Sequence, residues 1–247
     1  MSHLDLESKD FVAELLNYGK AGSEPVDPLP MIQRLSLSLA LTLNWGVRMD
    51  SQENKLFDEI THVEEEISRF RSTTGNLQDY IPLLRLNPLS FGSKKAGEMR
   101  DRRDVYLTAL NKDLESRMEK GTHKPCIQAN VILDQEAKLN SEELTSISLT
   151  MLSGGLDVSI IFFLDLRHAD WVLVQTVTTL LQWSVALLAQ RLDIQQKAWR
   201  AIEEFYSVEQ PLCDALDDQK CSYVVALVRE CLRYVLLFHT LILGTPS

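Results

Sequence analysis

The 247-residue sequence contains little of what marks several large classes of protein. It has four cysteines, too few for a disulfide framework, and no two of them form the Cys-x-x-Cys pair typical of a structural zinc site: Cys126, Cys213, Cys221 and Cys231. Positive charge is also scarce, because 25 Lys and Arg face 35 Asp and Glu, which gives a net charge of −10. So acidic a chain is unsuited to nucleic acid or an anionic membrane as its main partner.

Long hydrophobic runs are missing as well. No stretch of 18 apolar residues occurs, which predicts that no helix spans a membrane. The first ten residues hold neither a basic segment nor an apolar core, so no secretory signal is visible. The sequence therefore predicts an intracellular chain that lacks a membrane anchor.

What the sequence does contain is helical periodicity, in a chain that is 45% apolar. Residues 51–72 are the clearest case, with apolar side chains at spacings of four and three: Leu56, Ile60, Val63, Ile67 and Phe70. Three acidic residues, Glu64, Glu65 and Glu66, are expected on the opposite face. Helices are also expected over 5–18, 93–120, 140–150, 176–190, 194–206 and 219–236. The predicted fold class is therefore mainly α.

Two stretches within this pattern need a choice. Leucines alternate with small residues over 35–43, a period of two that normally indicates a strand. Leucine and alanine favour helix, however, and β-branched residues are nearly absent there, so we predict a helix. In the 93–120 helix, basic and acidic residues are interleaved, which favours a solvated face over a basic docking patch.

The helix that starts near residue 140 carries an unusual pair of glycines. Asn140 and Glu143 form the pattern of a capping box at its start. Its apolar pattern then reaches Gly154 and Gly155, and two glycines inside a helix cost about 1 kcal/mol each relative to alanine. A packing or ligand requirement is the more specific interpretation of the pair, and a helix end is the simpler one.

Two motifs in a fixed order carry a family resemblance. The first is Gly154-Gly155-Leu156-Asp157, and the second, roughly 75 residues later, is Glu230-Cys231-Leu232-Arg233. The second motif alone is weak evidence for a family, because ion pairs three residues apart are common on helix surfaces. With their surroundings, the motifs make the chain resemble the cytochrome P-450 family of haem-thiolate monooxygenases, closest to a filamentous-fungal branch that hydroxylates phenylacetate-type acids. The resemblance covers 17–20, 34–45, 67–88, 120–157 and 210–234.

The resemblance implies a fold, a cofactor and partners. The fold would be an incomplete cytochrome P-450 fold from about the D helix to the K helix, with the glycine pair on the central I helix. The cofactor would be haem, and the partners an NADPH-cytochrome reductase and a small aromatic acid such as phenylacetate. Full-length members are expected at the endoplasmic reticulum membrane, and this chain is expected to be truncated at both ends.

It also implies roles for particular residues. Gly154 and Gly155 would let the helix backbone lie close to haem and oxygen, where a side chain would collide. Asp157 matches the acid that, with an alcohol after it, relays protons to the bound oxygen. Glu230 and Arg233 match a buried ion pair that supports the haem-binding core.

Departures from the family pattern point to an inactive chain. The family's haem-ligand cysteine lies in a Phe-x-x-Gly-x-Arg-x-Cys-x-Gly loop, and no cysteine here has that context. Without the axial thiolate, oxygen activation has no physical basis, and no metal-ligating residue is expected in this chain. The Trp-x-x-x-Arg contact to the haem propionate is missing too.

A further departure interrupts the central helix. The alcohol expected directly after Asp157 is replaced by Val158, and the pattern resumes only at Thr176. If 158–175 were helical, Thr176 would lie about 27 Å farther along the axis and could not partner Asp157. The segment begins Val-Ser and ends in Gln, which codons with intron borders could encode, so a translated intron is one hypothesis and a genuine insertion the other. Residues 1–247 are thus expected to be one partial domain with an insert at 158–175 and a divergent tail at 235–247.

Two other classes of function stay open. The chain could be a non-catalytic helical binding protein that derives from the family. It could also be an unrelated helical adaptor, in which case no haem-ligand loop would be found in the genomic sequence downstream.

Overall fold

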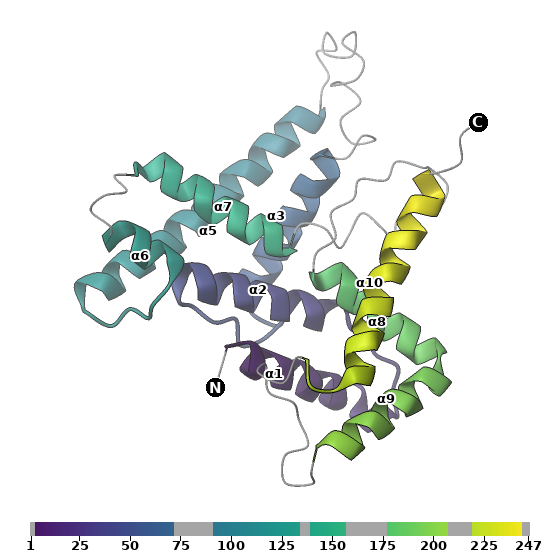
Figure 1. Ribbon diagram of the computed structural model, residues 1–247. Helices are drawn as coiled ribbons and strands as arrows, with labels where there is room; N and C mark the ends of the chain where they lie inside the picture. The colour runs from purple at the N-terminus through teal and green to yellow at the C-terminus, as the bar shows by residue number, and fades with distance from the viewer. Residues whose placement is uncertain (1–2, 72–90, 134–138, 157–176, 207–218, 244–247) are drawn as a thin grey trace. The chain divides into compact units, whose positions relative to one another are not determined.

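The computed structural model describes residues 3–71, 91–133, 139–156, 177–206 and 219–243, and the regular structure of these residues is helical (Figure 1). This confirms the predicted mainly α fold class. The helices are α1 (His3–Tyr18), η1 (Lys20–Gly22), α2 (Leu29–Trp45), α3 (Lys55–Arg71), α5 (Phe91–Glu119), α6 (Ile127–Leu133), α7 (Ser141–Leu156), α8 (Val177–Gln190), α9 (Leu192–Phe205) and α10 (Ser222–Leu243). Each helix predicted from the sequence is present, and α6 and η1 are additional.

The chain divides into two units, and the boundary falls within α2. Unit 1 consists of 1–32 and 179–247, and unit 2 consists of 33–178. Unit 2 contains the whole hydrophobic core cluster of the described residues: Leu37, Leu41, Trp45, Met49, Phe57, Ile60, Val63, Met99, Tyr106, Leu107, Leu110, Leu114, Cys126, Ala129 and Leu152. These side chains come from α2, α3, α5, α6, α7 and, for Met49 and Cys126, from the connections between helices, so this core positions the helix with the glycine pair.

The ambiguous leucine-rich segment is helical, as predicted, and α2 is buried on nearly all sides. Leucines 35, 37 and 41 and serines 36 and 38 are all buried, which explains why no polar face is visible in the sequence. Ser38 Oγ accepts a hydrogen bond from the Met49 amide at 3.1 Å. The alternation of leucine with serine therefore reflects a largely buried helix with small polar residues, and not a half-buried strand.

Helix ends follow the sequence signals closely. The α7 capping box is reciprocal, because the Glu143 amide donates to Asn140 Oδ1 at 2.9 Å and the Asn140 amide donates to Glu143 Oε2 at 2.8 Å. Gly121, after α5, has a φ of +66°, and the following Thr122 amide donates to the Arg117 carbonyl at 2.9 Å. These bonds satisfy backbone groups that the helix itself leaves unpaired.

Unit 1 is built from α1, η1, α8, α9 and α10, and fewer of its described apolar side chains are buried than in unit 2. α9 and α10 contact each other, and Cys221, just before α10, lies with its Sγ 3.8 Å from the Ala201 carbonyl oxygen of α9. On α1 the buried residues are Asp5 and Glu7, whereas the apolar residues at helical spacing, Phe11, Val12, Leu15 and Leu16, are half-buried or exposed. Among the described residues, no helix is long and apolar enough to cross a membrane.

Candidate functional site

The candidate site is the C-terminal end of α7, where the glycine pair lies. The helix runs through Gly154 and Gly155 to Leu156, so the pair lies in the last described turn of α7. Asp157 and Thr176, the predicted acid and displaced alcohol, lie outside the described residues, as does the segment 158–175. What the structure describes is therefore the set of contacts that hold α7 just before the pair.

A buried carboxylate ties α7 to two other helices. Glu64 of α3 accepts a hydrogen bond from the Tyr106 hydroxyl of α5 at 2.6 Å and from the Ser153 hydroxyl of α7 at 2.9 Å. One hydroxyl reaches Oε1 and the other reaches Oε2, so both carboxylate oxygens have a partner. Glu64 is 2% exposed and Tyr106 is 3% exposed. Burial and the adjacent Glu64 carboxylate raise the pKa of the Tyr106 phenol, so it stays a hydrogen-bond donor.

The sequence pattern puts Glu64 and Glu66 on the face opposite the apolar residues, whereas the structure buries both. A signal was present in the spacing. Glu64 follows Ile60 by four residues and Phe57 by seven, so it lies on the same helix face as two core side chains. Three successive glutamates hid that position, since the residue type suggested solvent.

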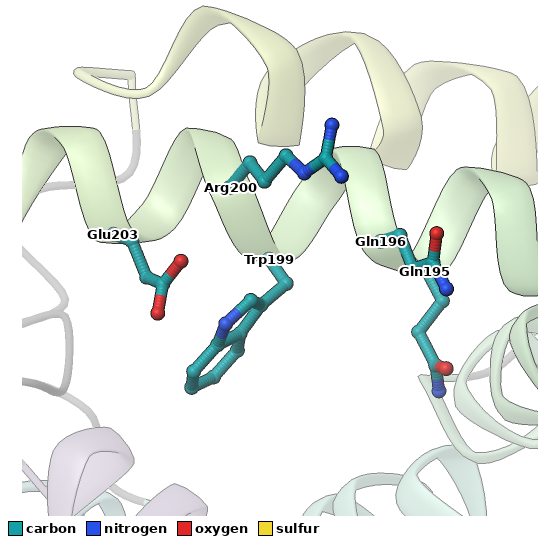
Figure 2. A pocket seen from close by; sticks show the side chains of 5 residues that line it. All are labelled: Gln195, Gln196, Trp199, Arg200 and Glu203. Atoms are coloured by element: carbon teal, nitrogen blue, oxygen red, sulfur yellow. The ribbon is translucent and has the colours of Figure 1, made fainter.

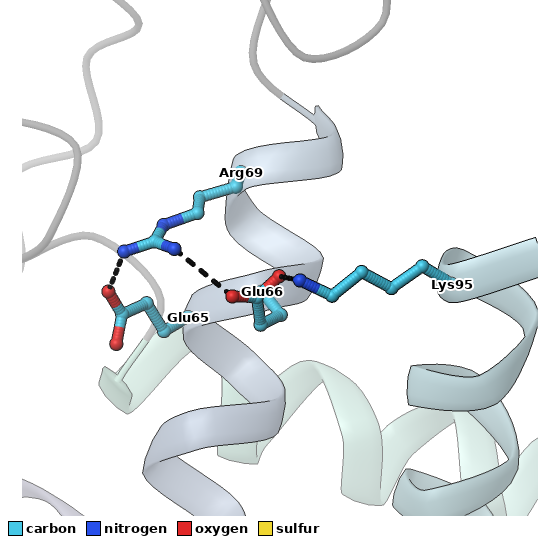
Figure 3. A network of polar contacts seen from close by, with 4 residues as sticks. All are labelled: Glu65, Glu66, Arg69 and Lys95. Carbon is cyan, nitrogen blue, oxygen red and sulfur yellow. Dashed lines mark hydrogen bonds and ion pairs between the residues drawn. The ribbon is translucent and has the colours of Figure 1, made fainter. Parts of the chain in front are cut away.

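Glu66 joins α3 to α5 beside this network (Figure 3). It accepts Lys95 Nζ at 2.6 Å and Arg69 Nη1 at 3.0 Å, while Glu65 accepts the other Arg69 nitrogen, Nη2, at 2.5 Å. The bond from Lys95 keeps the pKa of Glu66 below its ordinary value. The charged face of α5 is therefore not solely a solvated surface, because Lys95 links it to the neighbouring helix.

A second buried contact holds α7 from another side. Asn44 of α2 donates to the Ser148 carbonyl at 3.2 Å, and Gln128 of α6 bonds both the Ser148 hydroxyl and, at 3.3 Å, the Leu144 carbonyl. Ser148 and Ser153 are five residues apart, which places them roughly 140° apart around the helix axis. α7 is thus clamped by polar side chains on two different faces.

Glu230 and Arg233 form the predicted ion pair on α10, with Arg233 Nε 2.9 Å and Nη2 2.5 Å from Glu230 Oε2. The expected burial is not found among the described residues, because the two side chains are 60% and 62% exposed. Arg233 lowers the pKa of Glu230, as any close guanidinium would. In this setting the pair is an ordinary i, i+3 surface contact.

The described residues do not fit haem by themselves. A haem of this family requires an accessible cysteine thiolate, but Cys126, Cys221 and Cys231 are all buried. Cys126 lies in the core of unit 2. The described residues form a shallow surface hollow on α9 and another on α5, and neither Cys221 nor Cys231 is among the described residues that line them. Across the described part of the chain, no three His, Cys, Asp or Glu side chains are grouped to hold a metal ion.

The hollow on α9 is a shallow surface feature of unit 1 (Figure 2). Its described lining comes from one helix and is mixed in chemistry: Gln195, Gln196, Trp199, Arg200 and Glu203. The Trp199 indole extends away from the helix into open space, and the residue is 61% exposed. Its described lining contains no thiol, so it does not fit the family's haem.

The chain is similar in sequence to a known protein family and to several known proteins. A family model described as cytochrome P450 matches residues 2–161. The chain is 72% identical over 232 residues to a protein of Emericella nidulans named 3-hydroxyphenylacetate 6-hydroxylase, across 94% of this chain and 41% of that protein. It is 40% identical over 237 residues to phenylacetate 2-hydroxylase of the same organism, with 95% and 42% covered.

A more distant relative gives the same coverage. A cytochrome P450 monooxygenase of Mycosarcoma maydis is 32% identical over 235 residues, which cover 94% of this chain and 40% of the relative. The chain therefore spans about two fifths of the length of the curated relatives it matches.

Proposed function

The chain belongs to the cytochrome P450 family, and on that premise we propose that it forms the helical part of a monooxygenase that hydroxylates a small aromatic acid. The observation that carries the proposal is its 72% identity to a protein named for 6-hydroxylation of 3-hydroxyphenylacetate. The relative named for 2-hydroxylation of phenylacetate supports the same substrate class. Membership of the family argues against the unrelated helical adaptor.

Within this function, α7 is the central helix of the site. We assign Gly154 and Gly155 to the backbone that lies beside the haem, Asp157 to the acid and Thr176 to the alcohol, displaced by the insert. Glu230 and Arg233 are assigned to support of the haem-binding core. Because the pair is exposed in the described residues, this role requires that another segment of the protein covers it. The family's haem supplies oxygen activation, and its electrons come from an NADPH-cytochrome reductase. No reaction step is assigned to the described residues, because they contain no fitting thiolate.

The 247 residues alone are proposed to be inactive. Their sequence does not contain the Phe-x-x-Gly-x-Arg-x-Cys-x-Gly loop, so they cannot hold the haem iron through the family's cysteine. To test this, haem and dithionite are added to the purified chain and the carbon-monoxide difference spectrum is recorded. We expect no Soret band at the thiolate position. A band there, abolished by replacing one of the cysteines with serine, would refute the inactivity.

The insert and the tail are treated as departures from the family domain. We propose that 158–175 is a translated intron, so that a spliced transcript joins Asp157 directly to Thr176, and that 235–247 arises from a similar read-through or a frame change. Sequencing the transcripts tests this, since retention of all 54 nucleotides in every read would refute the intron.

The transcripts also provide the protein with which the substrate class can be tested. The product of the longest transcript, supplied with NADPH and a reductase, is expected to hydroxylate 3-hydroxyphenylacetate or phenylacetate in preference to a matched acid without the ring, such as acetate. Formation of no hydroxylated aromatic product from a haem-loaded protein would contradict the proposed substrate class. We place that longer product at the endoplasmic reticulum membrane, which cell fractionation tests.

A non-catalytic binding protein is the second candidate, and one observation favours it. Unit 1 exposes large apolar side chains on α9, among them Leu192, Trp199 and Phe205. Exposed apolar groups of this size commonly mark interaction surfaces. Under this alternative, no transcript encodes the haem-ligand loop, so the transcript sequences separate the two candidates.

A further inference from the structure

We propose that Glu64 is a positioning residue for the glycine pair of α7, because its buried carboxylate fixes Ser153 and Tyr106 together directly before the pair. The consequence for a reacting group rests on the proposed function, whereas the positioning itself is a property of unit 2. No role for Glu64 is visible in the sequence motifs that carry the family resemblance.

The geometry brings three helices to one carboxyl group. Tyr106 is 42 residues from Glu64 in the sequence, and Ser153 is 89 residues away. Their hydroxyls nevertheless reach opposite oxygens of the carboxylate at 2.6 and 2.9 Å. Because each of α3, α5 and α7 contributes one group, the contact fixes the relative position of all three helices within unit 2.

A buried carboxylate has an advantage over an apolar side chain only where the position of its hydrogen-bond partners matters. Burying an ionised carboxylate costs several kcal/mol, and a well-packed apolar side chain in its place is often neutral or more stable. Glu64 recovers part of that cost through two hydroxyl donors, which bond an ionised acceptor more strongly than a neutral one. What an apolar replacement cannot provide is a defined direction for Ser153, since dispersion contacts permit sliding that a bond of this length does not.

The glycine pair needs such a constraint from outside. Gly154 and Gly155 have no side chains with which to contact neighbours, and each weakens the helix by about 1 kcal/mol relative to alanine. The axial position of this backbone must therefore be set by flanking residues. Ser153 is the residue directly before the pair, and the contacts of Asn44 and Gln128 hold the preceding turns from another face.

The position of the pair has a consequence for the proposed reaction. A displacement of about 1 Å in a catalytic arrangement can lower a rate about a hundredfold. A carboxylate that holds α7 at the residue before the pair thus acts on the reaction through the helix backbone, without contacting the substrate.

The test separates a local effect on α7 from a general loss of stability. Hydrogen–deuterium exchange, followed by mass spectrometry of the intact 247-residue chain, reports peptides from α7, α2 and α5 separately. The variants are Glu64→Leu, Glu64→Gln, Ser153→Ala and Tyr106→Phe. The matched controls are Glu65→Gln, the neighbouring acid that pairs with Arg69, and Thr150→Ala, an exposed hydroxyl that bonds only its own helix backbone.

We expect Glu64→Leu and Ser153→Ala to raise exchange at 150–156 about five- to tenfold more than in α2 and α5, the size of effect that one lost hydrogen bond gives. Glu64→Gln keeps the shape and can still bond both hydroxyls, so it should restore most of the protection. The controls should leave α7 unchanged.

Uniform acceleration over α2, α5 and α7 would overturn the proposal, because it would make Glu64 a general stabilising residue. Failure of Glu64→Gln to protect α7 better than Glu64→Leu would overturn it as well. If the Glu64 variants do not fold, Ser153→Ala and Tyr106→Phe carry the test, since each removes one hydroxyl. The experiment contains no haem or substrate, so its result does not depend on whether the proposed function holds.

Discussion

Trp45 and Trp199 show how differently the two units treat the same side chain. Trp45 of unit 2 is 0% exposed, and its indole Nε1 donates to Asn111 Oδ1 at 2.7 Å. Trp199 of unit 1 extends from α9 into open space and is 61% exposed (Figure 2). One indole is thus both packed and hydrogen-bonded, while the other has most of its surface in water.

The contrast extends to the rest of each unit. All members of the hydrophobic core cluster belong to unit 2, where buried polar groups also join its helices in pairs. Among the described residues of unit 1, the buried apolar side chains are Met31, Ile32, Ala198, Cys221 and Cys231, while Leu16, Trp199 and Phe205 are exposed. Unit 2 therefore has the contacts needed to hold α7 rigidly, whereas the helices of unit 1 have fewer contacts that resist local opening.

The largest difference in stability is expected between the alanine variants of the two tryptophans. Trp45→Ala should lower the free energy of unfolding by about 3–5 kcal/mol, because it leaves a cavity and removes the partner of Asn111. Trp199→Ala should change it by no more than about 0.5 kcal/mol. Urea titration followed by circular dichroism, which does not rely on tryptophan fluorescence, measures both. Equal losses would contradict the difference between the units.

A smaller effect is expected from Tyr106→Phe, through alkaline pH. Burial and Glu64 raise the pKa of Tyr106 above its unfolded value near 10, so the folded state keeps a proton that the unfolded state loses. The stability from this group is therefore complete below about pH 10 and falls above it by up to about 1.4 kcal/mol per pH unit. Tyr106→Phe should flatten this fall in urea titrations between about pH 9 and 11.

The control for this prediction is Tyr18→Phe, which removes an exposed phenol of unit 1. An alkaline slope that both substitutions reduce equally would mean that the buried network of unit 2 is not its source.

The ion pair between Glu59 of α3 and Arg102 of α5 should contribute less. Arg102 Nε lies 2.8 Å and Nη2 2.5 Å from the two oxygens of Glu59, but both side chains are about one-third exposed. Arg102→Met should cost about 0.2–1 kcal/mol, and less at about 1 M salt. Arg102 lowers the pKa of Glu59, so the contribution is present above the unfolded value near 4.5 and is lost as the pH falls below it.

Urea titrations at neutral and acid pH measure this loss. Arg100→Met, on the same helix and exposed, is the control. A cost for Arg102→Met that persists unchanged at acid pH would contradict an origin in the ion pair.

These contacts mark the limit of what the sequence could predict. Periodicity predicted the helices because each apolar stripe is local, and the capping box of Asn140 and Glu143 needs only residues three apart. The leucine-rich α2 was predicted correctly from its composition, although its alternation of leucine with small residues is typical of a strand.

The partners of the buried carboxylates could not be predicted in the same way. Glu64 is stabilised by hydroxyls 42 and 89 residues away, and no local pattern shows that Tyr106 and Ser153 will meet there. The helix α1 was predicted correctly from its apolar spacing, but that spacing does not show whether a neighbouring surface covers Phe11, Val12, Leu15 and Leu16, which are half-buried or exposed. The roles of Asp157 and Thr176 stay predictions, because both residues lie outside the described part of the chain.

The smallest effect is expected in unit 1, from the pair of Arg191 and Asp193 at the start of α9. Arg191 Nε and Nη2 lie 2.9 and 3.0 Å from the two Asp193 oxygens, and this contact lowers the pKa of Asp193 to about 2. Arg191→Met should raise that pKa only part of the way to 3.8, because the Ile194 amide and the helix N-terminus still favour the carboxylate. Carboxyl chemical shifts followed by NMR against pH measure the change.

In both this pair and the Glu59–Arg102 pair, the arginine Nε and Nη2 bond the two oxygens of one carboxylate, and the pairs differ in what they connect. Arg102 joins two helices, whereas Arg191 bonds a residue two positions away on an exposed helix end. The lowered pKa of Asp193 contributes stability only above about 3.8, and it is lost as the pH falls towards 2. At neutral pH, Arg191→Met should therefore shift the urea midpoint less than Arg102→Met does. An equal shift would show that surface pairs stabilise the two units alike, and that the rigidity of unit 2 comes from its buried groups alone.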